Sequence, residues 1–216
     1  MNNIIFDNVV PQIFRHTENL SSDIWSGFLE FEKGKLYLVE AESGKGKSTF
    51  CSYILGYRND YSGTISFDGT DIRSYRVSDW VRVRQRNVSH LFQELRLFPE
   101  LTAWENVQIK NNISSAGHTS EEQIKIWFDM LGIGDKLDAK IGKMSFGQQQ
   151  RVAMLRALVQ PFDFLLVDEP ISHLDDSNSR IMGEIMLSEA RRQEAAVIVT
   201  SIGKRMELPY DTVIRL

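Results

Sequence analysis

Residues 41–49 read Ala-Glu-Ser-Gly-Lys-Gly-Lys-Ser-Thr, a glycine-rich segment that few folds accommodate. An apolar, alternating run over 35–39 precedes this stretch, and Phe50, Ile54 and Leu55 follow it at helical spacing. A strand, a glycine-rich loop and a helix in this order turn successive backbone N–H groups and the positive end of the helix dipole toward one point. We therefore predict a phosphate-binding loop.

The predicted loop assigns separate roles to its residues. Lys47 is expected to reach the β- and γ-phosphates of a nucleotide, and Ser48 is expected to ligate Mg²⁺. The pattern has a glycine where this chain has Ala41, a change that is costly only if the backbone there needs a positive φ. The other loop residues expected to bind nucleotide are Ser43, Gly44, Lys45, Gly46 and Thr49. A glycine- and lysine-rich surface turn without a ligand is the alternative for this segment alone.

Composition narrows the class of protein further. The chain has 216 residues, and its 25 basic and 29 acidic side chains give a formal charge of −4. Because it has no long basic run, nucleic acid is not a predicted partner. The single cysteine, Cys51, excludes a disulfide scaffold and is expected to be a small buried thiol. Since no apolar stretch is long enough to span a membrane, we expect a soluble, cytoplasmic chain.

The predicted secondary structure changes from strands to helices around residue 94. Before it, short alternating or apolar segments predict strands, and after residue 160 such segments return. The predicted strands, besides 35–39, are 4–10, 29–32, 64–67, 87–92, 164–167 and 196–200. Residues 94–160 are expected to be mainly helical, with a helix over Thr119–Ile133 that opens on a capping box of Thr119 and Glu122.

Two carboxylates follow the apolar segment Phe164-Leu-Leu-Val, at Asp168 and Glu169. Open α/β sheets bind their ligands at the carboxyl ends of the strands, so this segment has the character of a Walker B motif. Asp168 is expected to hold the Mg²⁺ shell, and Glu169 to orient or deprotonate the attacking water. An ordinary strand that ends in an acidic turn is the alternative.

A third motif lies over residues 144–151, with the sequence Met-Ser-Phe-Gly-Gln-Gln-Gln-Arg, followed by a helix. With this segment between the phosphate loop and Asp168, the sequence resembles the ATP-binding cassette family, whose signature is usually Leu-Ser-Gly-Gly-Gln. The resemblance implies that Ser145, Gly147 and Gln148 contact the γ-phosphate of ATP held by a second copy of the chain. Phe146 replaces the first glycine of the signature. A polar helix start without a ligand is the alternative.

The resemblance covers most of the chain, about 4–216, and includes further motifs in family order. Gln93 is similar to the Q-loop glutamine, which touches Mg²⁺ or water beside a segment that meets a membrane permease. Residues 172–175 look like the D-loop at the dimer interface. Phe14 is a candidate for the aromatic side chain that stacks on adenine, or is a core residue. The sequence of residues 97–107 is similar to that of the subfamily that serves lipoprotein release, macrolide export and cell division.

One departure from the family concerns its switch histidine. This chain has Val-Thr-Ser at 199–201, so Ser201 stands where the family has a histidine that contacts the γ-phosphate. His173 could approach a phosphate from the D-loop, although a solvated or interface position is the simpler interpretation. The resemblance thus implies catalytic roles for Glu169, Gln93 and Ser201, and Mg²⁺ ligands at Ser48, Gln93 and Asp168.

The sequence therefore predicts an α/β fold: a P-loop NTPase core of ABC type with an N-terminal antiparallel β-subdomain and an inserted α-helical subdomain. Residues 1–93 and 161–216 form the core and its β-subdomain, and about 94–160 the helical subdomain, in a minimal cassette that ends at Leu216. We expect an ATPase that dimerises around two ATP molecules with Mg²⁺ and drives a separate permease, peripherally on the inner face of the membrane. The alternatives are a subunit that binds ATP but scarcely hydrolyses it, and a soluble ABC ATPase unrelated to transport.

Overall fold

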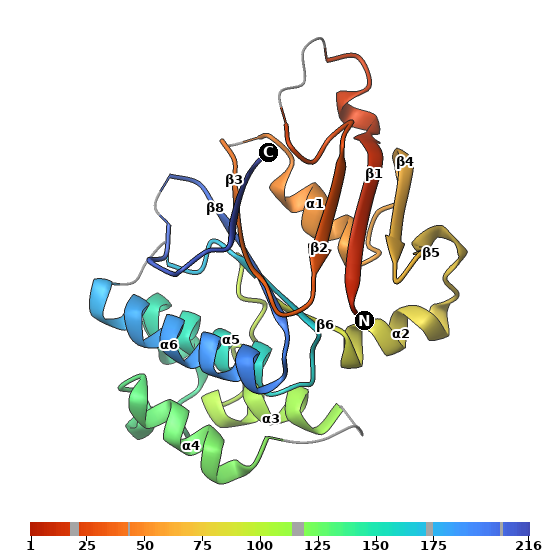
Figure 1. Ribbon diagram of the computed structural model, residues 1–216. Coiled ribbons are helices and arrows are strands. Elements are labelled where there is room, and N and C mark those ends of the chain that lie inside the picture. Colours follow the sequence, from red (N-terminus) through yellow and green to blue (C-terminus); the bar gives the residue numbers. More distant parts are fainter. Residues whose placement is uncertain (18–21, 43, 114–118, 172–174, 204) are drawn as a thin grey trace.

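The computed structural model describes residues 1–17, 22–42, 44–113, 119–171, 175–203 and 205–216. Two β-sheets organise these residues, and α1 lies with the antiparallel sheet in the upper part of Figure 1. The antiparallel sheet has the order β2-β1-β4-β5 and consists of β1 (Asn3–Pro11), β2 (Phe28–Glu32), β4 (Tyr61–Phe67) and β5 (Thr70–Asp71). All its strands come from the first third of the chain, as the short alternating segments predicted.

The second sheet is parallel throughout and has the order β6-β7-β8-β3-β9. Its strands are β3 (Leu36–Glu40), β6 (Val88–Leu91), β7 (Phe164–Asp168), β8 (Ala196–Ser201) and β9 (Thr212–Arg215). Parallel strands need long crossover connections, which here contain the helices. Because all these strands run in one direction, the residues that follow β3, β6, β7 and β8 meet at one edge of the sheet.

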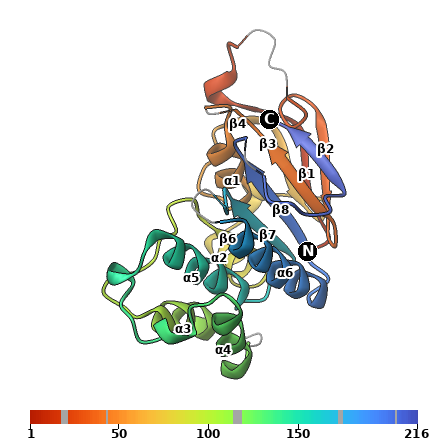
Figure 2. The same ribbon diagram turned by 90° about the vertical axis from the view of Figure 1, so that its left-hand side faces the viewer.

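Helices cover both faces of the parallel sheet. The six α-helices of the described residues are α1 (Lys47–Ile54), α2 (Val77–Arg86), α3 (Ala103–Ile113), α4 (Glu121–Met130), α5 (Phe146–Leu158) and α6 (Asp176–Arg192). In both views α3 and α4 gather at the end of the molecule away from β1, with α5 between them and the sheet (Figures 1 and 2). No helix of the described residues is long and apolar enough to cross a bilayer.

Side-chain alternation along the parallel strands sends successive residues into two separate cores. In β7, Leu165 and Val167 belong to the core shared with α3, α4, α5 and α6. Phe164 and Leu166 belong to the other core, which contains Phe50 of α1 and the inner face of the antiparallel sheet. Hence α1 lies on one face of the parallel sheet, and α5 and α6 lie on the other.

The predicted α/β fold is confirmed, one helix was not predicted, and one predicted helix start is wrong. Helix α2 was not predicted; Val77, Trp80 and Val81 lie at helical spacing, but charged residues surround them and Val83 is the only buried residue of this helix. The cap of α4 is Ser120, whose hydroxyl accepts a hydrogen bond from the Gln123 backbone N–H, and Thr119 lies one residue outside the helix. Thr119 instead donates its hydroxyl proton to the carbonyl of Val159 at 3.2 Å. The boundaries of the two predicted subdomains stay a prediction.

Candidate nucleotide site

The predicted phosphate loop connects β3 to α1, at the edge where the parallel strands end. Gly46 caps α1 with a φ of 101°, and Gly44 has a φ of 82°, conformations that side chains rarely adopt. Ala41 is not among the residues with positive φ, so its methyl group adds no backbone strain. The loop therefore keeps the shape that its two glycines predict, despite the missing first glycine. Ser43 lies outside the described residues.

Phe14 lies directly against this loop. A Cβ atom placed on Gly46 would come within 3.0 Å of the Phe14 ring and 3.4 Å of the Trp25 ring. A larger residue at position 46 would therefore have to displace the Phe14 ring and adopt a strained φ, which favours glycine. The indole N–H of Trp25 also points at the carbonyl of Lys45, at 3.5 Å. Sequence reasoning found Phe14 but missed Trp25, whose contact with the loop no motif marks.

Lys47 joins the loop to the end of β7. Its ammonium group lies 3.0 Å from Oε1 of Glu169, and both side chains are largely buried. The Gln93 amide donates a hydrogen bond of 3.2 Å to the other oxygen, Oε2 of Glu169. Three residues that are far apart in the sequence thus meet at the carboxyl edge of the sheet. For Lys47 to hold a phosphate group, this ion pair must exchange its carboxylate for phosphate oxygens.

The backbone at Glu169 is unusual and explains where its carboxylate points. Glu169 has a φ of 49°, in the left-handed region, and its N–H donates to the carbonyl of Thr200 at 3.1 Å. Such a conformation costs about 1 to 3 kcal/mol in a residue other than glycine. The strained turn after β7 therefore holds the carboxylate beside Lys47 and Gln93.

Asp168 is held from the neighbouring strand. Asp168 and Thr200 are register partners in β7 and β8, and the Thr200 hydroxyl donates a hydrogen bond to Oδ1 of Asp168. Burial raises the pKa of Asp168 above its usual range, while the Thr200 hydrogen bond opposes that rise. Thr200 is a further residue that sequence reasoning missed, although the adjacent Ser201 received a role. Ser201 is buried at the end of β8, and its carbonyl accepts from the Ala41 N–H at 3.2 Å.

The structure also places the other loop residues. Lys45 and Ser48 are exposed, while Thr49 is buried and its hydroxyl accepts a hydrogen bond of 3.1 Å from Arg58. Thr49 therefore has a partner within the protein. Oxygen donors from Ser48, Gln93 and Asp168 are the ligand type that Mg²⁺ prefers, and Asp168 is already oriented by Thr200. The residues present fit a Mg²⁺ ion bound together with phosphate oxygens.

The signature segment, residues 144–151, lies on the other face of the sheet. Ser145 caps α5, its hydroxyl accepts from the Gln148 N–H, and the Gln148 side chain accepts from the Ser145 N–H. This reciprocal capping box holds the first turn of α5, with Gly147 inside it. Both views show α5 away from α1, with the parallel sheet between them (Figures 1 and 2). The signature therefore does not join Lys47 and Glu169 in one cluster. Residues 172–174 of the predicted D-loop, including His173, lie outside the described residues.

The phosphate loop, its lysine and the carboxylates at the end of β7 define a P-loop nucleotide-binding protein. A family model described as "ABC transporter" matches residues 28–172. The lipoprotein-releasing system ATP-binding protein LolD of Novosphingobium aromaticivorans is 30% identical over 189 residues, covering 87% of this chain and 84% of that protein. The glutamine transport ATP-binding protein GlnQ of Bacillus subtilis is 32% identical over 174 residues, covering 80% and 71%.

Solved structures agree with the fold. The dimeric bacterial ABC transporter cassette MJ0796 superposes with a TM-score of 0.76 at 24% identity, over 91% of this chain and 87% of that chain. A post-hydrolysis state of the same cassette, bound to ADP and Pi, also superposes with a TM-score of 0.76. The chain belongs to the ABC transporter family, as an ATP-binding ATPase subunit.

Proposed function

We propose that two copies of this chain close around two ATP molecules, hydrolyse them with Mg²⁺, and thereby drive a separate integral-membrane permease. The main support for a dimer is the distance between the phosphate-binding loop and the signature segment within one copy of the chain. Lys47 begins α1, which lies on one face of the parallel sheet, and pairs with Glu169 at the carboxyl edge of that sheet. Ser145 caps α5, which lies on the other face. Because one copy keeps these groups apart, a second copy is needed to place Ser145 and Gly147 against the γ-phosphate.

Within one site, each described residue has a physical task. Lys47 and the N-terminus of α1 bind the phosphates, and Phe14 stacks on adenine beside the loop. Asp168 and Ser48 hold Mg²⁺, which supplies charge stabilisation at the phosphates. Once Lys47 turns to the phosphates, the Glu169 carboxylate is released to accept a proton from water, and Gln93 is close enough to orient that water.

Relatives of similar identity serve different transport systems. The relatives matched here include a lipoprotein-releasing protein and a glutamine transport protein. We expect the tagged chain to co-purify with a separately encoded integral-membrane permease from detergent-solubilised membranes, and its ATPase rate to rise in that complex. The Lys47→Ala variant controls for turnover by contaminating ATPases. Recovery of the chain without the permease, and a rate that the permease leaves unchanged, would favour a soluble ABC ATPase.

Ser201→His tests whether the missing histidine limits turnover. A serine at this position offers the γ-phosphate a shorter side chain than imidazole, and loss of a positioned donor costs about 10² to 10³ in rate. We expect wild-type turnover to be slow and the histidine variant to hydrolyse ATP faster at similar ATP affinity, in a phosphate-release assay. Ser201 is only 3% exposed, so Ser201→Asn is a matched control for added volume. A fast wild-type rate that histidine does not improve would show that another group performs this task.

A further inference from the structure

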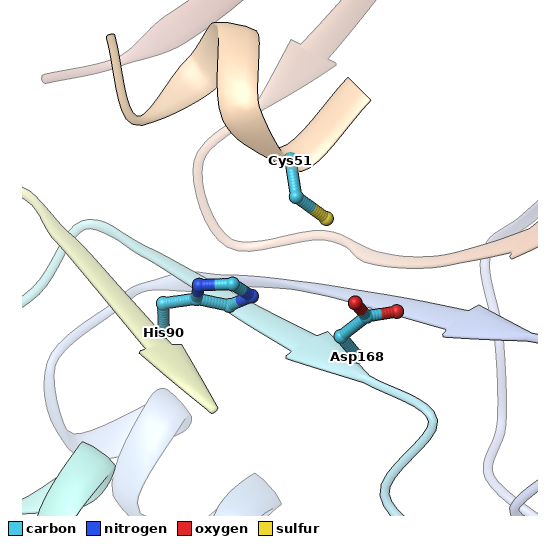
Figure 3. Close-up of side chains that lie close together, drawn as sticks. All are labelled: Cys51, His90 and Asp168. Carbon is cyan, nitrogen blue, oxygen red and sulfur yellow. The ribbon is translucent and has the colours of Figure 1, made fainter. Parts of the chain in front are cut away.

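Cys51, His90 and Asp168 form a cluster beside the nucleotide site that the proposed function does not use. One ligand atom from each residue, the thiol sulfur, a ring nitrogen and a carboxylate oxygen, lies within 4.8 Å of the other two. Figure 3 shows the three side chains extending from a helix and two strands toward the same space. Each of these groups is a common ligand of transition-metal ions.

The fold brings these residues together for reasons that the sequence contains. Cys51 lies four residues after Lys47 in α1, so both side chains emerge on the same face of this helix. In β6 and β7, His90 pairs with Leu166, and alternation puts His90 and Asp168 on the face that α1 covers. All three residues of the cluster therefore lie within a helix or a strand, which fixes their positions relative to one another.

The environment of the His90 imidazole indicates that this cluster binds a ligand. Both of its ring nitrogens are buried, and neither has a hydrogen-bond partner among the described residues. A buried polar atom without a partner destabilises the fold, so an ion bound by one nitrogen would relieve part of this cost. Burial lowers the pKa of His90 to about 3, which keeps the imidazole in the neutral form that binds metals.

We propose that Cys51, His90 and Asp168 bind a divalent transition-metal ion of the Zn²⁺ type, and that this ion withdraws Asp168 from Mg²⁺. Zn²⁺ takes sulfur, nitrogen and oxygen ligands at about 2.0 to 2.3 Å, whereas Mg²⁺ avoids sulfur. Tetrahedral geometry at these bond lengths puts ligand atoms about 3.3 to 3.7 Å apart, so the three side chains must close slightly around the ion. The thiol proton passes to solvent on binding, and the fourth position remains open to water.

The surroundings of Asp168 suit such an ion. The Thr200 hydroxyl already donates to Oδ1 of Asp168, and ligating carboxylates are usually held by an outer hydrogen bond of this kind. The consequence for activity rests on the proposed function: an ion at this site would inhibit ATP hydrolysis by competing for the same carboxylate. Binding itself does not depend on that function and can be measured without nucleotide.

Cobalt(II) provides the direct test, used with the untagged full chain in the absence of nucleotide. Because Cys51 is the only cysteine, a thiolate-to-cobalt charge-transfer band can arise only from this site. We expect the band to saturate at one Co²⁺ per chain, to disappear on addition of Zn²⁺, and to persist in excess Mg²⁺. Cys51→Ala should abolish the band. His90→Phe should weaken Co²⁺ binding by about 100-fold or more, since even outer partners of a ligand contribute about 10- to 100-fold.

His16→Ala, at an exposed histidine, is the matched control and should bind Co²⁺ as the wild type does. Thermal unfolding of each variant without metal verifies that its fold is intact. Absence of the band in the wild type, or a band that His90→Phe leaves at wild-type affinity, would overturn the proposal. Since this readout involves no ATP, it can fail while the ATPase assignment holds, and the reverse is also possible.

Discussion

Lys47→Ala is expected to lower ATP affinity by about 10- to 100-fold and to reduce turnover below detection. The lost contact is a charge-assisted one to phosphate, worth about 1.5 to 3 kcal/mol, and 1.4 kcal/mol corresponds to tenfold in affinity. Turnover falls further than affinity, because the same ammonium group faces charge that grows in the transition state. Equilibrium binding of a fluorescent ATP analogue and a phosphate-release assay measure the two effects separately.

Lys45→Ala is the matched control for this experiment. It removes the same type of side chain from the same loop, but Lys45 is exposed and its backbone carbonyl, rather than its ammonium group, contacts Trp25. Alanine keeps the backbone N–H through which residue 45 is expected to contact phosphate, so we expect this variant to bind ATP as the wild type does. Lys47→Ala also leaves the largely buried Glu169 without its cation, so its thermal unfolding must be compared with that of the wild type. Equal ATP affinity in Lys47→Ala and the wild type would contradict the phosphate-loop assignment.

Glu169→Gln is expected to reduce the hydrolysis rate by about 10² to 10⁴ while ATP binding is retained. Glutamine preserves the size of the side chain and can still contact Lys47 and Gln93, but an amide cannot accept the proton of the attacking water. Single-turnover kinetics with radiolabelled ATP isolate this step from product release. Glu122→Gln, at an exposed position of α4, makes the same chemical change away from the site and should leave the rate unchanged.

Much of the fold follows from short-range patterns in the sequence. Alternation of apolar and polar residues predicts β1, β2, β3 and β4, and continuous apolar runs predict β7 and β8. These patterns arise because each strand buries one or both of its faces. Helix α2 was not predicted, because its apolar residues Val77, Trp80 and Val81, although at helical spacing, form a short stripe within a strongly charged segment. The start of α4 shows a different limit: Thr119 and Ser120 can both cap a helix, and the contact of Thr119 with Val159 decides between them.

Some residues of the candidate site could be predicted from local sequence, and others could not. Lys47 and Asp168 were predictable because each belongs to a local motif with fixed spacing after a strand. Thr200 was not, because its role depends on the register between β7 and β8, which pairs it with Asp168. Trp25 and His90 likewise act through contacts between distant segments. Local motifs therefore mark the residues that we propose bind the nucleotide, while tertiary pairing is needed to find the residues that contact them.

If one copy of the chain holds only part of each ATP site, ATP must bring two copies together. Multi-angle light scattering of purified Glu169→Gln during size-exclusion chromatography, with ATP and Mg²⁺, measures this association. We predict a mass twice that of the monomer with ATP, and the monomer mass with ADP or without nucleotide. Ser145→Arg, added to Glu169→Gln, places a large cation at the exposed start of α5 and should keep the protein monomeric with ATP. A monomer mass for Glu169→Gln at saturating ATP and high protein concentration would contradict the account.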